Sequence, residues 1–186
     1  MGFVLFQQSK PTPQKYGPSA PLPDSYTNHE SAPRDTPLPQ QLPPRINRKL
    51  SNGTIIRSSS LHGRGQLTIK NGLSLDAAAK LIDKQNNLCK AYFYISSGSP
   101  FALTGVPDGN YRLLFGIGED WDQATEFFTR NQAFSEFNKP MDFVTFQEQR
   151  GDSIYKNYTV MEVPPHPVPG GNIRTHSISE KEFQQY

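Results

Sequence analysis

Three carboxylates and the sole tryptophan occur together in the stretch Glu119-Asp120-Trp121-Asp122, directly after the glycine-rich letters GIG. In an extended segment Asp120 and Asp122 point the same way, near enough to share an ion. Three kinds of chemistry fit this pattern: a divalent-cation loop, a carbohydrate site in which Trp121 stacks on a sugar, or a carboxylate pair for glycosidic cleavage. A calcium loop needs about six to eight oxygen ligands, more than this stretch supplies. We therefore predict no metal site and no catalytic residues here.

The remaining residue types that perform catalysis are scattered. The four histidines, at positions 29, 62, 166 and 176, lack the close spacing of zinc ligands. Cys89 is the only cysteine, which excludes an internal disulfide, and its aromatic surroundings favour a half-buried structural thiol. The glycines form no phosphate-binding loop and no nucleophile elbow. The sequence thus predicts a protein that is not an enzyme and needs no cofactor.

The composition divides the chain into a tail and a core-forming domain. Ten of the 17 prolines lie in the first 44 residues, whereas 17 of the 21 aromatic residues follow position 64. Residues 1–64 carry a net charge of +5 and residues 65–186 one of −3, so the domain is a poor nucleic-acid binder. We predict that residues 1–64 form a disordered Pro/Ser-rich linker and that residues 65–186 form the folded domain. Within the linker, Ile46–Leu50 and Thr54–Ser58 could each add an edge strand.

The first residues suggest a weak link to a membrane. The apolar run Phe3–Phe6 is too short to span a bilayer or to form a signal-peptide core, but it resembles the remnant of a longer anchor. An anchor followed by a long polar tether would place the domain near a membrane, which favours a periplasmic or membrane-tethered location over the cytoplasm. A plain cytosolic tail remains the alternative.

Short apolar runs bounded by turn residues predict an all-β domain. Alternation or aromatic content predicts strands over residues 66–70, 89–95, 101–104, 110–115, 143–146, 154–163 and 172–178. Residues 77–83 contain alanines that suit a helix, but their position between two strands favours a strand. Residues 122–137 do not alternate, which predicts an irregular or briefly helical crossover. Ser179 and Glu182 have the spacing of a capping box for one terminal helical turn. Seven or eight strands so spaced predict a single antiparallel β-sandwich.

The stretch GVPDGNYRLLF, residues 105–115, is the most specific feature of the sequence. Pro107 presets one backbone angle, Gly109 tolerates a tight reversal, and Tyr111 can face Val106 across a hairpin. The motif formed by Gly105, Pro107, Gly109 and Tyr111 resembles the hairpin of carboxypeptidase-regulatory-like and prealbumin-like β-sandwich domains. That resemblance implies a small non-catalytic sandwich that packs on, spaces or displays other domains, often in cell envelopes.

These observations favour a non-enzymatic, protein-binding or accessory module that a flexible linker tethers within a larger assembly. The alternative is a carbohydrate-binding module that uses Trp121 and its neighbouring carboxylates Glu119, Asp120 and Asp122, together with Tyr92 or Tyr94. A hydrolase built on the same carboxylates is the third and weakest hypothesis.

Overall fold

The computed structural model describes residues 46–166 and 174–186, which form an all-β domain with one short C-terminal helix. Its strands are β1 (Ile55–Ser58), β2 (Gly65–Lys70), β3 (Asp76–Asp83), β4 (Cys89–Ile95), β5 (Pro100–Val106), β6 (Gly109–Asp122), β7 (Phe127–Phe137), β8 (Met141–Phe143), β9 (Thr145–Arg150), β10 (Ser153–Tyr158), β11 (Val160–Val163) and β12 (Thr175–Ser177), followed by helix α1 (Glu180–Gln184). The prediction of an all-β fold with antiparallel sheets is confirmed, although the described residues contain more strands than the seven or eight expected.

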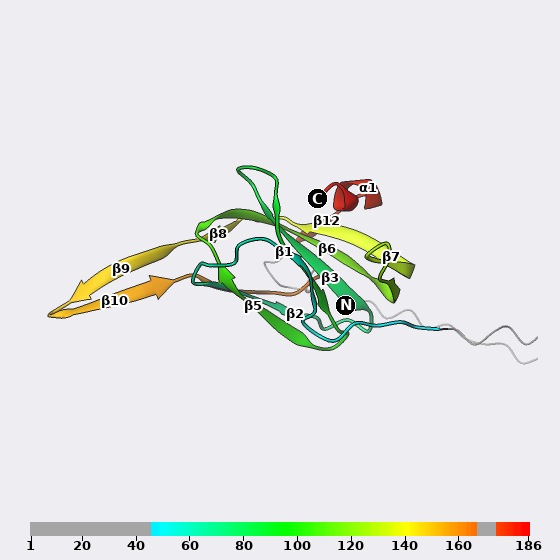
Figure 1. The fold of residues 1–186 in the computed structure, drawn as a ribbon, viewed down its shortest axis with the longest axis horizontal. Coiled ribbons are helices and arrows are strands. Elements are labelled where there is room, and N and C mark those ends of the chain that lie inside the picture. The colour runs from blue at the N-terminus through cyan, green and yellow to red at the C-terminus, as the bar shows by residue number, and fades with distance from the viewer. Residues whose placement is uncertain (1–45, 167–173) are drawn as a thin grey trace, which may run out of the picture. The chain divides into compact units, whose positions relative to one another are not determined.

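Two sheets pack face to face. The large sheet has the order β1-β4-β3-β6-β7-β12, with β8 also paired to β6, and the small sheet has the order β11-β2-β5 (Figure 1). All the described pairings are antiparallel except that of β11 with β2. The main core lies between the sheets and takes its side chains from alternate positions of each strand, for example Leu67 and Ile69 of β2 and Leu113 and Phe115 of β6.

Strand β3 confirms the predicted strand over residues 77–83 in spite of its alanines. It lies between β4 and β6, and both of its faces are covered: Ala77 and Ala79 belong to the core between the sheets, whereas Ala78 and Ile82 belong to a second cluster on the outer face. Packing on both faces of the strand stabilises it by more than the free energy by which its alanines favour a helix.

The predicted irregular crossover at 122–137 is wrong, because most of it forms the 11-residue strand β7. Its phenylalanines do not alternate regularly because the pairing of β6 with β7 shifts register between Ile117 and Glu119. Opposite this bulge, Asn131 has a φ of 51°, in the left-handed region that asparagine tolerates.

Residues 105–115 do not form a hairpin, contrary to the sequence-based prediction. Strand β5 pairs with β2 in the small sheet, whereas β6 pairs with β3, β7 and β8 in the large sheet, so the turn carries the chain from one sheet to the other. The Tyr111 hydroxyl donates to the Pro107 carbonyl at 3.0 Å and closes this crossing. Val106 and Tyr111 are both buried in the core between the sheets.

The domain begins earlier than the predicted boundary at residue 65. Strand β1 pairs with β4, and the Gly63 amide donates to the Gly105 carbonyl at 2.8 Å. Residues 46–64 therefore belong to the folded unit. The rest of the predicted linker, residues 1–45, lies outside the described residues.

Candidate functional site

The carboxylates of residues 119–122 lie at the end of β6 and do not converge on one point. Asp120 has a φ of 58°, which breaks the alternation that would have placed it beside Asp122. Glu119 accepts a hydrogen bond from the Asn131 amide at 3.0 Å, and Asp122 accepts one from the Ala124 backbone at 2.9 Å. Arg130 lies between two of them, 3.8 Å from the Glu119 carboxylate and 3.3 Å from that of Asp120. No group of three or more metal-ligating side chains occurs in the described parts of the chain.

Asp120 instead attaches the segment that precedes β1. Arg48 donates to its carboxylate from the backbone at 3.0 Å, from Nε at 2.8 Å and from Nη2 at 3.1 Å. The Thr129 hydroxyl donates to the same carboxylate at 2.6 Å. Donors of this kind stabilise the ionised form, so the hydrogen bond with Arg48 lowers the pKa of Asp120 well below its usual range.

We expect Asp120→Asn to loosen residues 46–50. The Trp121 amide donates to the Arg48 carbonyl at 2.9 Å, so loosening hydrates the indole and shifts Trp121 emission to longer wavelength. Because the pKa is lowered in the folded state, the contribution of Asp120 is fully present above its unfolded pKa of about 3.9. It decreases as the pH falls from that value towards the lower pKa of the folded state. The shift should therefore appear on acidification of the wild type and already at pH 7 in the variant.

Asp122→Asn is the matched control, because Asp122 accepts from Ala124 and makes no hydrogen bond with Arg48. If the two variants gave the same emission spectrum at pH 7, Asp120 would not be what attaches this segment.

The rings proposed as a sugar-stacking platform are covered by other rings. Trp121 is 3% exposed, and Tyr92 and Tyr94 are fully buried in the outer-face cluster. The indole packs edge-on against Tyr94 and Phe128, with ring centroids 5.6 and 5.0 Å apart. A sugar requires an open ring face, and none of these three rings offers one.

The residues of the turn at 105–111 have a structural role that reaches beyond the turn. Asp108, between Pro107 and Gly109, accepts hydrogen bonds from the Thr145 backbone at 3.0 Å and from the Thr145 hydroxyl at 2.8 Å. Thr145 is the first residue of β9. The turn therefore fixes the place where the chain leaves the sandwich.

Strands β9 and β10 form a two-stranded arm that extends away from both sheets (Figure 1). Their two-residue turn places Gly151, with a φ of 62°, at its first position, where a hairpin turn needs a positive φ. At the base of the arm, Val144 and Thr159 exchange backbone and side-chain hydrogen bonds of 3.0–3.3 Å. Strands at 143–146 and 154–163 were predicted, but their pairing outside the sandwich was not.

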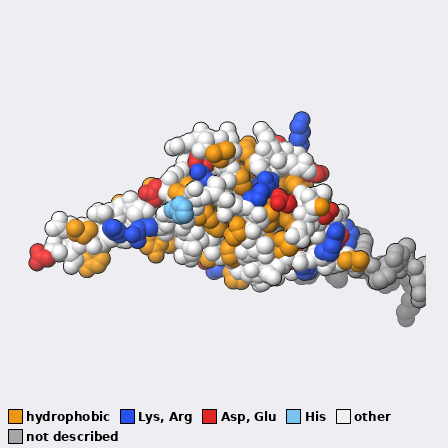
Figure 2. All heavy atoms as spheres, in the orientation of Figure 1, with side chains coloured by type: hydrophobic (Ala, Val, Ile, Leu, Met, Phe, Trp, Pro, Cys, Tyr) orange, Lys and Arg blue, Asp and Glu red, His pale blue; other side chains and the backbone are white. Residues whose placement is uncertain are grey.

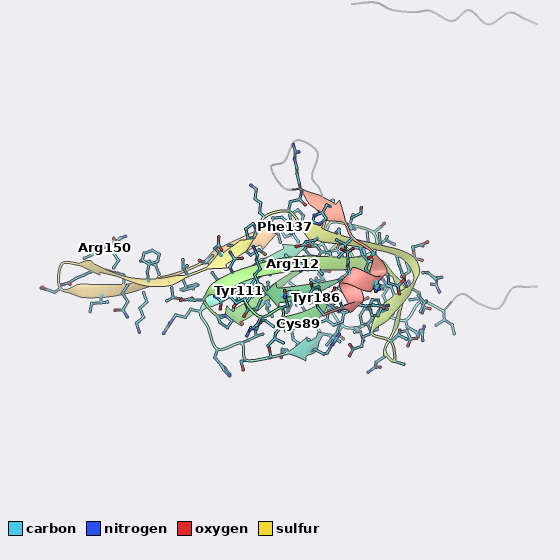
Figure 3. The ribbon with its side chains drawn as sticks, turned by 90° about the horizontal axis from the view of Figure 1, so that it is seen from above. Cys89, Tyr111, Arg112, Phe137, Arg150 and Tyr186 are labelled. Carbon is cyan, nitrogen blue, oxygen red and sulfur yellow. The ribbon has the colours of Figure 1, made fainter. Side chains whose placement is uncertain are left out.

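The arm carries large apolar side chains that the rest of the domain does not cover. Four are at least 47% exposed, and Figure 2 shows hydrophobic side chains along its length: Phe146 (55%), Ile154 (67%), Tyr155 (50%) and Tyr158 (47%). Exposed apolar surface beyond scattered single residues often marks an interaction site on a protein. The end of the arm is polar: Arg150 lies there (Figure 3), and Asp152 belongs to the turn.

Both faces of the arm contribute to this surface. Residues directly opposite in an antiparallel pair share a face, so Phe146 and Tyr155 lie on one side and Ile154 and Tyr158 on the other. On the side of Tyr155 the charged groups pair with one another: Arg150 contacts Glu148 at 2.9 Å and lies 5.6 Å from the Tyr155 ring. On the opposite side, Lys156 lies between Ile154 and Tyr158 and makes no ion pair with any described residue.

Fold and surface together define a β-sandwich domain with a protruding, partly apolar two-stranded arm. No family model matches the chain, no curated protein matches it, and no solved structure matches it. The resemblance to carboxypeptidase-regulatory-like domains therefore stays a prediction. In residues 46–166 and 174–186, no helix has the length and apolar character needed to cross a membrane.

Proposed function

We propose that this chain is a non-enzymatic protein-binding module whose β9–β10 arm is the contact surface, within a larger assembly. The observation that carries the proposal is the exposure of Phe146, Ile154, Tyr155 and Tyr158 on a ribbon that projects from the sandwich. An isolated two-stranded ribbon is only marginally stable in water, and it gains stability when a partner buries its side chains.

The distribution of side chains on the arm favours a protein partner over a lipid bilayer. A membrane-inserting hairpin would carry its apolar residues at the tip, whereas here the tip holds Arg150, Gly151 and Asp152. The apolar residues occupy both faces of the stem instead. A partner that encloses the stem from two sides would bury them without burying the charges at the tip.

In this proposal the tail, residues 1–45, sets the distance over which the domain can move from its point of attachment. The composition of residues 1–45 predicts a flexible chain, and 45 flexible residues have a root-mean-square span of roughly 35–40 Å. A domain attached by such a tether near a membrane or an assembly could search the surrounding volume for its partner. Envelope location and membrane proximity remain parts of the proposal that depend on this tail.

Site-specific photo-crosslinking tests the proposal. A photoreactive residue at position 154 or 155 of the full chain should give one crosslinked product in an extract of the native host. Excess unlabelled wild type should compete for that product, and excess Ile154→Ser/Tyr158→Ser should not. A photoreactive residue at Leu88, which is exposed on the body of the domain, is the matched control. The same product from position 88, or competition by the double variant, would contradict the arm as the contact surface.

A further inference from the structure

The outer side of β10 continues directly into that of β11. At the junction the Thr159 amide donates to the Val144 carbonyl and the Thr159 carbonyl accepts from the Gln66 amide, both at 3.1 Å. The amide and the carbonyl of one extended residue point to the same side, so β9 and β2 lie on the same side of this chain. Backbone groups alternate between the two sides along a strand. Those that point to the other side belong to Ile154, Lys156, Tyr158, Val160 and Glu162.

This other side, which we term the open edge (residues 154–162), has no strand beside it among residues 46–166 and 174–186. Strand β10 pairs with β9 alone, and β11 is the last strand of the small sheet. The second edge of the arm differs, because the outward Thr145 amide of β9 donates to the Asp108 carboxylate at 3.0 Å. The open edge is therefore the longer run of unused backbone donors and acceptors on the arm.

Other strands at the edges of the two sheets are short, interrupted or covered. Strands β1 and β12 have four and three residues, and β7 is interrupted by the left-handed Asn131. Strand β5 begins with Pro100 and contains a bulge at Gly105. The Asn52 side chain donates to the Pro100 carbonyl at 3.0 Å. The Gly63 amide donates to the Gly105 carbonyl at 2.8 Å. Such features prevent pairing between sheet edges, whereas the open edge has no proline and no shift of register.

The open edge is complementary to itself. When two copies pair antiparallel about a two-fold axis at Thr159, Lys156 lies opposite Glu162 of the second copy, and Tyr158 lies opposite Val160 of the second copy. Opposite charges, aromatic with β-branched side chains, and threonine with threonine are all favourable cross-strand pairs. An axis at Lys156 would instead set two lysines opposite each other, and an axis at Tyr158 would leave both charges opposite apolar side chains. The side chains therefore specify one register.

The same register brings an exposed ring of the arm to an apolar groove. A groove of about 300 Å³ lies beside β11, between the two sheets. Its apolar lining is Phe137, Pro140, Met141, Met161 and Val163. With the axis at Thr159, Tyr155 lies opposite Val163 of the second copy and shares its face, which is the face of the groove. The Tyr155 side chain, 50% exposed in the single chain, thus gains an apolar site on the second copy.

We propose that two copies of this chain pair through the open edge, so that each arm adds two strands to the small sheet of the other copy. The proposal rests on the proposed function, because it names a second copy as the protein that the arm contacts. Each extended sheet has the order β9-β10-β11-β2-β5, in which the last three strands come from the second copy. The pairing of the two edges supplies about eight backbone hydrogen bonds, which a contact through side chains alone would lack.

Sedimentation equilibrium of the purified full chain tests the register through its charges. The wild type should reach twice the monomer mass of 20.9 kDa. Lys156→Glu and Glu162→Lys each set like charges opposite each other, so each alone should weaken the dimer by roughly tenfold or more. An equimolar mixture of the two variants should restore the wild-type affinity, because every Glu then faces a Lys. Both positions are exposed, so the thermal midpoints of the single variants should match that of the wild type.

A disulfide at the two-fold axis tests the same register by geometry. Thr159 pairs with itself at a position without backbone hydrogen bonds, where Cα atoms lie about 4.5 Å apart, within reach of a disulfide. Thr159→Cys should therefore give a covalent dimer on mild oxidation. In Asn157→Cys the two cysteines lie about 14 Å apart along the strands and should not be linked. The wild type, which retains Cys89, measures the background.

A full chain that stays monomeric, or a dimer whose affinity is the same in both charge variants, would overturn the proposal. Equal disulfide formation at positions 157 and 159 would overturn it as well. The photo-crosslinking test separates this failure from that of the proposed function. A product formed from position 155 with residues 137–141 or 161–163 of a second copy supports the proposal. A product with a different protein leaves the arm as a contact surface and contradicts the second copy.

Discussion

Replacement of Ile154 and Tyr158 by serine should weaken partner binding by roughly 100-fold, because each side chain contributes about 1.5 kcal/mol when a partner buries it. The two residues lie on the same face of the arm, one on each side of Lys156 and two positions from it. Both side chains are exposed to solvent in the free protein. Substitution at exposed positions rarely changes the free energy of unfolding by more than about 0.5 kcal/mol. Binding should therefore fall while the thermal midpoint stays the same.

The partner crosslinked through position 154 or 155, once purified, allows this loss to be measured as a change in Kd by calorimetry. Leu88→Ser is the matched control, since Leu88 is equally exposed but lies on the body of the domain. A normal Kd for the double variant would show that the apolar face of the arm does not contribute to binding. A raised Kd for Leu88→Ser, that is weaker binding, would move the contact to the body.

Gly105→Ala should be among the most destabilising single changes, by about 3 kcal/mol. Gly105 has a φ of 79°, and a Cβ added there would lie 2.6 Å from the Leu61 carbonyl oxygen. The clash is with backbone, which can move only if the crossing between the sheets moves as well. The free energy of unfolding from urea denaturation gives the size of the effect.

Gly98→Ala separates the cost of a side chain at a positive φ from the cost of the clash with the Leu61 carbonyl. Gly98 has a similar φ of 66°, but a Cβ added there would meet nothing within 4 Å. It should therefore show the conformational cost alone, about 1 kcal/mol. If both substitutions cost the same, the close approach of Leu61 to the turn does not stabilise the fold.

Local sequence patterns predicted the strands far better than they predicted how the strands pair. The runs at 66–70 and 89–95 were found because alternation, aromatic content and flanking turn residues are local properties. The strand at 77–83 was assigned from its position between two strands, against its local helix propensity. The turn at 105–109 was read as a hairpin because its residues specify a reversal but not the sheets on either side. Sheet membership depends on contacts between residues distant in sequence, such as Gly63 with Gly105.

The candidate site could be predicted only in part from the sequence, because it too depends on contacts between residues distant in sequence. Glu119, Asp120 and Asp122 are neighbours in sequence, but the left-handed backbone of Asp120 and the arrival of Arg48 separate their roles. Lys80 gave no signal, since lysine is ordinarily a surface residue and its burial depends on the C-terminal residues around Phe183. The arm could have been suspected from Gly151-Asp152, a hairpin signal between the strands predicted at 143–146 and 154–163.

The most direct test of the central claim is the hydrogen-exchange footprint of the arm in the free protein and in the assembly purified from the native host. The account predicts that the amides of residues 146–149 and 154–158 become protected in the assembly, whereas the turn at 151–152 changes little. Arm amides that exchange at the same rate in both samples, with new protection elsewhere on the domain, would contradict it.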